Sequence, residues 1–132
     1  MSDDDLEALR ERRLAELEQQ LDQPERPSSP VPVGSPDELD GLVGTHDVVI
    51  VDFHAEWCGP CQHQQPILTR IAADTDAVVA TVDIDRQPGL AQSHGVRSVP
   101  TLIVYAGGEP AERLVGVQSE PALRDHIDRL RQ

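Results

Sequence analysis

The sequence predicts an α/β domain of three layers, in which helices flank a central mixed β-sheet. Two continuous apolar runs, at residues 48–53 and 77–84, have the pattern of buried strands. A segment with helical spacing lies between them, and a Gly-Gly pair at 107–108 joins two later strand-like segments as a hairpin. Strands joined through helices run parallel and hairpin strands run antiparallel, so the sheet is predicted to be mixed.

Residues 1–22 are predicted to form an acidic N-terminal helical extension. Ser2 and Asp5 have the spacing of a capping box, and acidic residues suit the start of a helix. Its leucines give only a short, narrow apolar stripe, made by Leu14, Leu17 and Leu21. We favour a solvated helix, and a helix that docks on a partner is the alternative.

Residues 23–34 are predicted to be a semi-rigid linker, because they hold four prolines and two serines. The domain then covers residues 35–132. Its first helix starts at Ser35, with Glu38 three positions later. The remaining elements, in order after the strand at 48–53, are a helix at 59–73 kinked by Pro66, the strand at 77–84, a short helix at 88–94, a hairpin of strands 101–105 and 113–117, and a helix capped by Ser119.

The composition is acidic, with 24 acidic residues against 11 basic ones and a net charge of −13. All the basic residues are arginines, and lysine is absent. This balance argues against nucleic acid or an anionic membrane as a partner. Such an excess of acidic residues is typical of proteins from extremely halophilic archaea. At low salt the negative side chains repel one another, but about 1 M salt shortens the Debye length to about 3 Å and screens this repulsion. An ordinary acidic bacterial protein is the alternative.

The two cysteines, Cys58 and Cys61, enclose a Gly-Pro pair at the predicted start of a helix. A helix N-terminus stabilises a thiolate, and the thiolate is the form that attacks disulfides. The motif therefore predicts a thiol–disulfide exchange centre. A structural disulfide is disfavoured by the tight loop. A zinc site is disfavoured because only His54 and His63 lie nearby and four ligands are needed.

From about residue 31 to the C-terminus, the chain resembles the thioredoxin family. The resemblance rests on separated stretches in the right order: residues 51–61, 82–85, 95–102, 107–109 and 115–116. It implies the thioredoxin fold and a protein-disulfide reductase that works through a Cys58–Cys61 dithiol/disulfide cycle. It also implies a monomer without bound cofactor or metal that receives electrons from a thioredoxin reductase and acts on disulfide-containing client proteins. The start of the chain lacks the pattern of a secretory signal, so we expect a cytoplasmic protein.

The resemblance also assigns roles to single residues. Cys58 is expected to be the exposed nucleophile and Cys61 the resolving cysteine. Asp52 stands inside an apolar strand, where burial should raise its pKa and allow it to take a proton from Cys61. A flat, apolar substrate-docking surface is expected from Trp57, Gly59, Pro60, Val99, Pro100 after a cis peptide bond, and Gly116.

Three residues depart from the family pattern: His54, Gln62 and Thr81. They stand where the family usually has an aromatic residue, a basic residue and, in many members, a lysine beside the buried aspartate. Without the two cations, we expect a less stabilised thiolate and an Asp52 that is harder to ionise. Two other functions stay open, namely a disulfide oxidant or isomerase on the same fold, and a non-enzymatic docking module. Gly-Pro between the cysteines resembles the reducing members.

Overall fold

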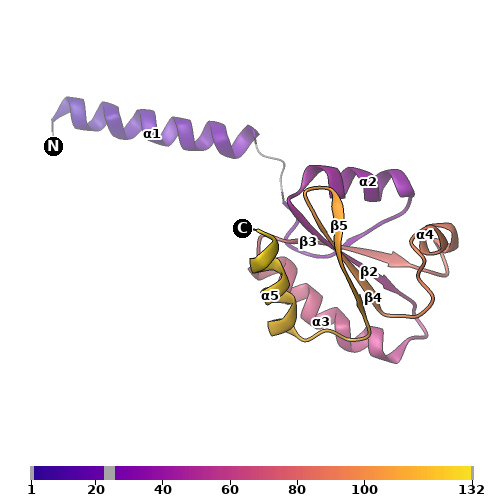
Figure 1. Ribbon diagram of the computed structural model, residues 1–132. Coiled ribbons are helices and arrows are strands. Elements are labelled where there is room, and N and C mark those ends of the chain that lie inside the picture. Colours follow the sequence, from indigo (N-terminus) through magenta and orange to yellow (C-terminus); the bar gives the residue numbers. More distant parts are fainter. Residues whose placement is uncertain (1, 23–25, 132) are drawn as a thin grey trace.

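The computed structural model describes residues 2–22 and 26–131, and in this part of the chain five strands form one mixed sheet with helices on both faces (Figure 1). The three-layer α/β class is therefore confirmed. The elements are, in chain order, α1 (Asp3–Asp22), β1 (Val31–Pro32), α2 (Pro36–Thr45), β2 (Val48–His54), α3 (Gly59–Asp74), β3 (Val78–Asp83), α4 (Pro88–Ser93), β4 (Thr101–Ala106), β5 (Glu109–Val115) and α5 (Glu120–Leu130).

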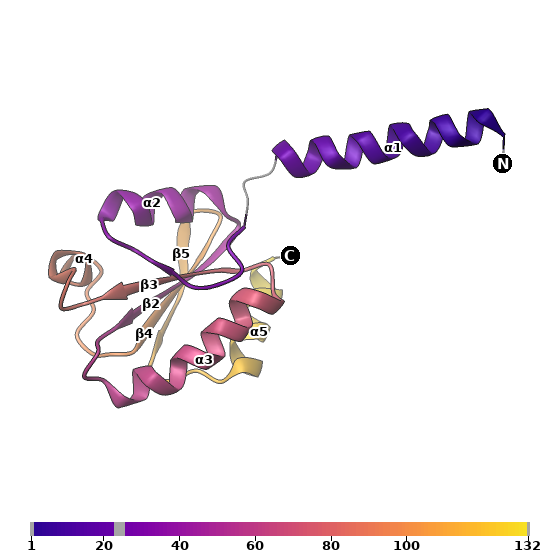
Figure 2. The same cartoon turned by 180° about the vertical axis from the view of Figure 1, so that it is seen from behind.

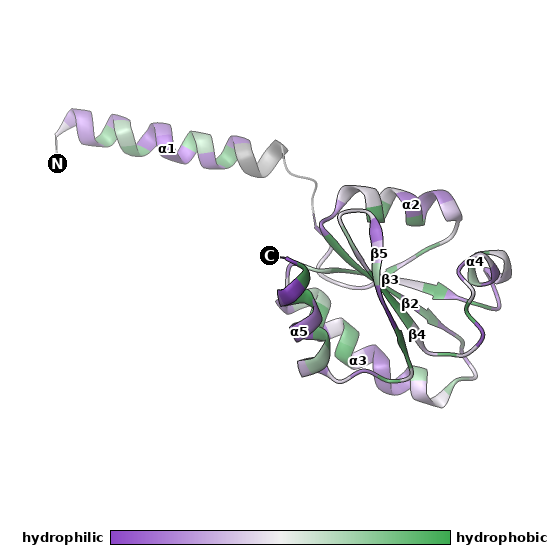
Figure 3. Ribbon diagram, in the orientation of Figure 1, coloured by the Kyte–Doolittle hydropathy of each residue, from purple (hydrophilic) through white to green (hydrophobic). Residues whose placement is uncertain are grey.

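The strand order is β1-β3-β2-β4-β5, with parallel pairing among β1, β3 and β2 and antiparallel pairing from β2 to β4 and β5. The central strands are mostly hydrophobic (Figure 3). Side chains alternate along β2, so Val49, Val51 and Phe53 pack with α2 and α4, whereas Val48 and Ile50 pack with α3 and α5. By the same alternation, Asp52 lies on the face that α3 covers.

The sheet begins earlier than the predicted domain boundary at residue 35. Val31 and Pro32 pair in parallel with Ala80 and Thr81 of β3, inside the segment that composition assigns to the linker. Proline is tolerated here because β1 is an edge strand, where a missing N–H leaves no gap in the ladder. Residues 23–25 of the predicted linker lie outside the described residues.

The hairpin differs from its prediction at both ends of the second strand. Gly107 and Gly108 have φ values of 61° and 85°, which suit a tight two-residue turn. Strand β5 therefore starts at Glu109 rather than at 113, although residues 109–112 have little strand propensity. It ends at Val115 because Gly116, with φ of 88°, turns the chain away.

The helix starts follow the predicted capping residues. The hydroxyl oxygen of Ser35 accepts the N–H of Glu38 at 3.2 Å, and that of Ser119 accepts the N–H of Ala122 at 3.2 Å. Helix α3 continues through Pro66 to Asp74. Both ribbon views show α1 extending away from the domain (Figure 2).

The leucines of α1 whose side chains are described, Leu6, Leu9, Leu14 and Leu17, are exposed, and the side chain of Leu21 lies outside the description. Such exposure agrees with a solvated helix. None of the helices in residues 2–22 and 26–131 is long and apolar enough to cross a membrane.

Candidate active site

Cys58 and Cys61 lie at the N-terminus of α3, where they form a disulfide with a Cα–Cα distance of 5.3 Å. Cys58 is the N-cap residue, and its Sγ accepts the backbone N–H of Cys61 at 3.2 Å. The helix begins where the motif predicts. In the reduced protein, the unpaired N–H groups and the positive end of the helix dipole would stabilise a thiolate on Cys58.

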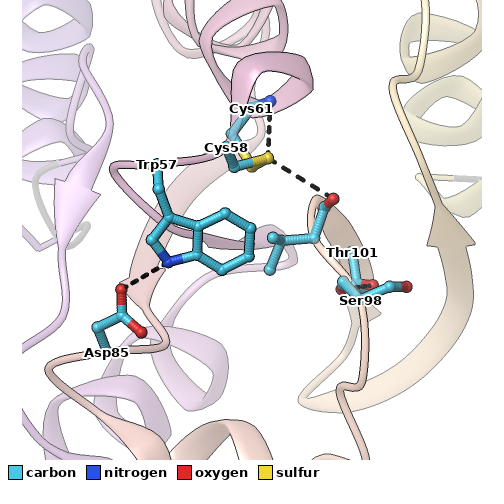
Figure 4. Close-up of a disulfide and its surroundings, with 7 residues drawn as sticks. Trp57, Cys58, Cys61, Asp85, Ser98 and Thr101 are labelled. Atoms are coloured by element: carbon cyan, nitrogen blue, oxygen red, sulfur yellow. Dashed lines mark hydrogen bonds between the residues drawn. A yellow bond between two sulfur atoms is a disulfide. The ribbon is translucent and has the colours of Figure 1, made fainter.

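Cys58 is not exposed, contrary to the expectation from the family. It is only 3% accessible and Cys61 only 2%, and both pack with Ala55 in a small apolar cluster that Ile84 and Val99 border. Cys58 is buried because the loop before β4, which is distant in the chain, lies over the sulfur atoms. The carbonyl oxygen of Val99 is 3.6 Å from Sγ of Cys58 (Figure 4).

The loop beside the disulfide contains the cis peptide bond between Val99 and Pro100 that the resemblance implied. Pro100 is buried, and its carbonyl oxygen accepts the N–H of Gly116 at 2.9 Å. This hydrogen bond brings two members of the expected docking surface together although they are far apart in the chain. Gly59 and Pro60 are exposed at the start of α3.

Trp57 stands beside the disulfide with 69% of its surface exposed. Its indole Nε1 donates a hydrogen bond of 2.9 Å to Oδ2 of Asp85, in the turn after β3 (Figure 4). Sequence reasoning missed Asp85, because no local pattern links residues 57 and 85.

Asp52 is buried, with 1% of its surface accessible, and neither carboxylate oxygen has a hydrogen-bond partner among the described residues. Burial disfavours the charged form and raises the pKa of Asp52 to about 7. The carboxyl group therefore changes its protonation state near neutral pH, where it can accept or return a proton. Thr81 is its neighbour in register on β3.

A groove of about 1000 Å³ opens beside Cys61 and is lined by all three departures from the family pattern, His54, Gln62 and Thr81. Carboxylates of Glu38, Glu56 and Asp83 and the guanidinium of Arg86 complete its charged lining. The groove is thus acidic on balance. Within the described residues, no group of three or more His, Cys, Asp or Glu could hold a metal ion.

Gln64 is a further residue that sequence reasoning missed. Its side chain is fully buried in α3, and both of its polar atoms bond to the backbone of Gln118. A signal was present, because Gln64 lies three residues after Cys61 and four before Leu68, on the buried stripe of the helix. A polar residue in such a stripe indicates a buried hydrogen-bond partner.

The chain matches the family model described as thioredoxin over residues 31–129. A thioredoxin of Mycobacterium tuberculosis (strain ATCC 25618 / H37Rv) is 42% identical over 84 residues, which cover 62% of this chain and 72% of that protein. A bifunctional thioredoxin reductase/thioredoxin of Mycobacterium leprae is 40% identical over 90 residues, which cover 66% of this chain and 20% of that protein.

The fold is similar to solved structures of the same kind. A mutant thioredoxin from Halobacterium salinarum NRC-1 matches with a TM-score of 0.79 and 44% identity, over 83% of this chain and 96% of that one. The oxidised thioredoxin from Plasmodium falciparum matches with a TM-score of 0.68 and 33% identity, over 76% of this chain and 97% of that one. With its Cys58–Cys61 disulfide at the start of α3, the chain belongs to the thioredoxin family and is a thiol–disulfide oxidoreductase.

Proposed function

We propose that the protein reduces disulfide bonds of cytoplasmic client proteins and carries the two electrons on Cys58 and Cys61. The observation that carries this proposal is the position of Cys58 Sγ. It caps α3, accepts the N–H of Cys61 at 3.2 Å and lies 3.6 Å from the carbonyl oxygen of Val99. A nucleophilic sulfur is thereby placed at the positive end of a helix and beside a backbone edge that an extended chain can pair with.

In the first step, the thiolate of reduced Cys58 attacks one sulfur of the client disulfide. A bond forms between Cys58 and that sulfur, and the client disulfide breaks. The other client sulfur leaves as a thiolate and takes a proton from solvent. The N–H of Cys61, which bonds to Cys58 Sγ, supports the thiolate before the attack.

In the second step, Cys61 attacks Cys58 and releases the client. Asp52 takes the proton of the Cys61 thiol, which then forms the Cys58–Cys61 disulfide as the second client sulfur leaves. A carboxyl pKa of about 7 suits this transfer at neutral pH. The client gains two electrons, and Asp52 later returns its proton to solvent.

The docking surface in this proposal surrounds the sulfur atoms. An extended client segment pairs with the backbone of Val99, as a strand added to an edge. Exposed apolar area comes from Trp57, and the small or flat residues around it allow a close approach. The set is Trp57, Gly59, Pro60, Val99, Pro100 and Gly116.

A thioredoxin reductase is the proposed electron donor, so the protein needs no bound cofactor of its own. The name of the Mycobacterium leprae relative joins a reductase and a thioredoxin in one chain, which supports this partner. One chain carries every residue of the cycle, which supports a monomer. A cytoplasmic location agrees with the reducing role, since cysteine thiols are kept in the reduced form in the cytoplasm.

We also infer an adaptation to concentrated salt, supported by the net charge of −13 and by the likeness to the Halobacterium salinarum thioredoxin. In this proposal residues 1–22 are a separate helical extension on the linker, and the exposed leucines of α1 support a solvated helix rather than a core element.

Trapping the intermediate tests the cysteine roles. A reduced Cys61→Ser variant should form a stable mixed disulfide through Cys58 with a disulfide-bonded peptide, and a Cys58→Ser variant should form none. Mass spectrometry of the adducts shows which cysteine carries the peptide. A stable adduct on Cys61 in the Cys58→Ser variant, with none in the Cys61→Ser variant, would reverse the roles.

The reduction potential separates the reducing role from the oxidising one. We expect a reduction potential of about −270 mV, as for thioredoxin, and not of about −120 mV, as for a strongly oxidising protein of the same fold. The gap of about 150 mV corresponds to about 7 kcal/mol. A value at the oxidising end, measured in concentrated KCl, would contradict the reductase.

A further inference from the structure

The side chain of Gln64 forms a two-point hydrogen-bonded pair with the backbone of one distant residue. Its Oε1 accepts the N–H of Gln118 at 2.6 Å, and its Nε2 donates to the carbonyl oxygen of Gln118 at 3.0 Å. Gln64 is fully buried, and the two residues are 54 positions apart. Helix α3 is thereby tied to the segment between β5 and α5.

The chemistry of this pair requires an amide. A glutamine presents one acceptor and two donor hydrogens at the end of its side chain, and the backbone of Gln118 presents the complementary N–H and carbonyl. A carboxylate could accept from the N–H but would face the carbonyl without a proton to donate. An apolar side chain would leave both backbone groups of Gln118 without this partner in a partly buried place, which costs free energy.

The segment between β5 and α5 is connected by hydrogen bonds to the loop that lies over the disulfide. Nε2 of Gln118 donates to the carbonyl oxygen of Gly116 at 3.2 Å, and the N–H of Gly116 donates to the carbonyl oxygen of Pro100 at 2.9 Å. The next carbonyl back along the chain, that of Val99, lies 3.6 Å from Cys58 Sγ. Hydrogen bonds thus lead from α3, which carries the cysteines, to the loop that faces them.

We propose that Gln64 is a positioning residue that holds the segment 115–118 and the Val99–Pro100 loop at a set distance from the sulfur atoms of Cys58 and Cys61. This inference rests on the docking surface of the proposed function. Both polar atoms of Gln64 bond to the backbone of Gln118, so it governs how a polypeptide disulfide is received and leaves thiol chemistry itself unchanged. The exposed apolar side chains of Val115 and Val117 are carried by the same segment.

The test compares a polypeptide disulfide with a small one. Gln64→Met keeps the length of the side chain and removes both hydrogen-bonding groups, and Gln92→Met makes the same change at an exposed position of α4. With insulin as the polypeptide substrate, Gln64→Met should raise KM about tenfold, equivalent to about 1.4 kcal/mol, with kcat nearly unchanged. The rate with hydroxyethyl disulfide should change less than about twofold. Gln92→Met should behave as the unchanged protein with both substrates.

Equal losses with both disulfides, or no loss with either, would overturn the inference. Gln64→Asn keeps the amide on a shorter side chain and should raise the KM less than Gln64→Met; it also serves if the methionine variant does not fold. Hydrogen exchange at the Gln118 amide gives a second readout, which should be slow in the unchanged protein and much faster in Gln64→Met. If the unchanged protein fails to reduce insulin, the proposed function is wrong, and unaltered exchange in the variant would refute the positioning role separately.

Discussion

The indole N–H of Trp57 donates a 2.9 Å hydrogen bond to the carboxylate of Asp85, and this bond joins the residue before the disulfide to the turn after β3. Asp85 is itself held in that turn, because its N–H donates to Oδ1 of Asp83 at 2.9 Å. Since most of the Trp57 surface is exposed, packing restrains the ring little. The bond to Asp85 therefore orients the largest apolar side chain near Cys58.

An Asp85→Ala variant should lower the rate of insulin reduction about threefold to tenfold, because the net contribution of a typical hydrogen bond is about 1 kcal/mol and this one is exposed to solvent. Trp57 is the sole tryptophan of the chain, so its fluorescence should change in intensity and anisotropy with the same substitution. Asp85→Asn retains a hydrogen-bond acceptor, so its rate of insulin reduction should fall less than that of Asp85→Ala. An Asp125→Ala control removes an exposed carboxylate elsewhere. Unaltered fluorescence together with an unaltered rate would refute the orienting role.

An Asp52→Asn variant should be more stable than the unchanged oxidised protein at pH 8 and nearly equal at pH 4. The folded protein has a carboxyl pKa of about 7 against 3.8 in the unfolded chain, so between these values only the folded state holds the proton. The free energy of unfolding of the unchanged protein therefore falls as pH rises from about 4 to about 7 and is level above. The full difference is about 4 kcal/mol by the linkage relation. Urea unfolding at both pH values measures it, and an equal difference at pH 4 and pH 8 would contradict the assigned pKa.

A Thr81→Lys variant should lower the pKa of Asp52. Thr81 is paired in register with Asp52 on the neighbouring strand and lines the groove beside Cys61, so a lysine there would bring a positive charge to a carboxylate whose described surroundings leave it unpaired. The upper end of the pH window in which the free energy of unfolding falls should then move to lower pH, so the window narrows. Gln65→Lys adds the same charge to the groove lining from an exposed position of α3 and should shift the window less. Equal shifts would mean that net charge, and not proximity, sets the pKa.

The melting temperature should rise with KCl concentration. With a net charge of −13 the folded chain repels itself at low salt, and at about 1 M salt the Debye length falls to about 3 Å, which screens most of this repulsion. Differential scanning fluorimetry from low salt to about 2 M KCl measures the trend. An unchanged melting temperature across that range would argue for an ordinary acidic protein.

The sequence by itself determined the elements whose signals are local. Buried strands β2 and β3 follow from continuous apolar runs, and the helix starts follow from residues such as Ser35 and Ser119, whose hydroxyls bond three positions ahead. The redox pair is local as well, because Cys58 and Cys61 lie in one turn of one helix. In these cases the partners are close in the chain, so neighbouring residues suffice to predict them.

Only the tertiary structure decided what depends on segments far apart in the chain. It buries Cys58 under the Val99 loop, adds β1 to the sheet and starts β5 at Glu109 by pairing it with β4. It also joins Trp57 to Asp85 and Gln64 to Gln118, across 28 and 54 residues. These contacts arise because packing the helices onto the two faces of the sheet brings together backbone and polar groups that are distant in the chain, and most polar groups that are buried in this way are hydrogen-bonded.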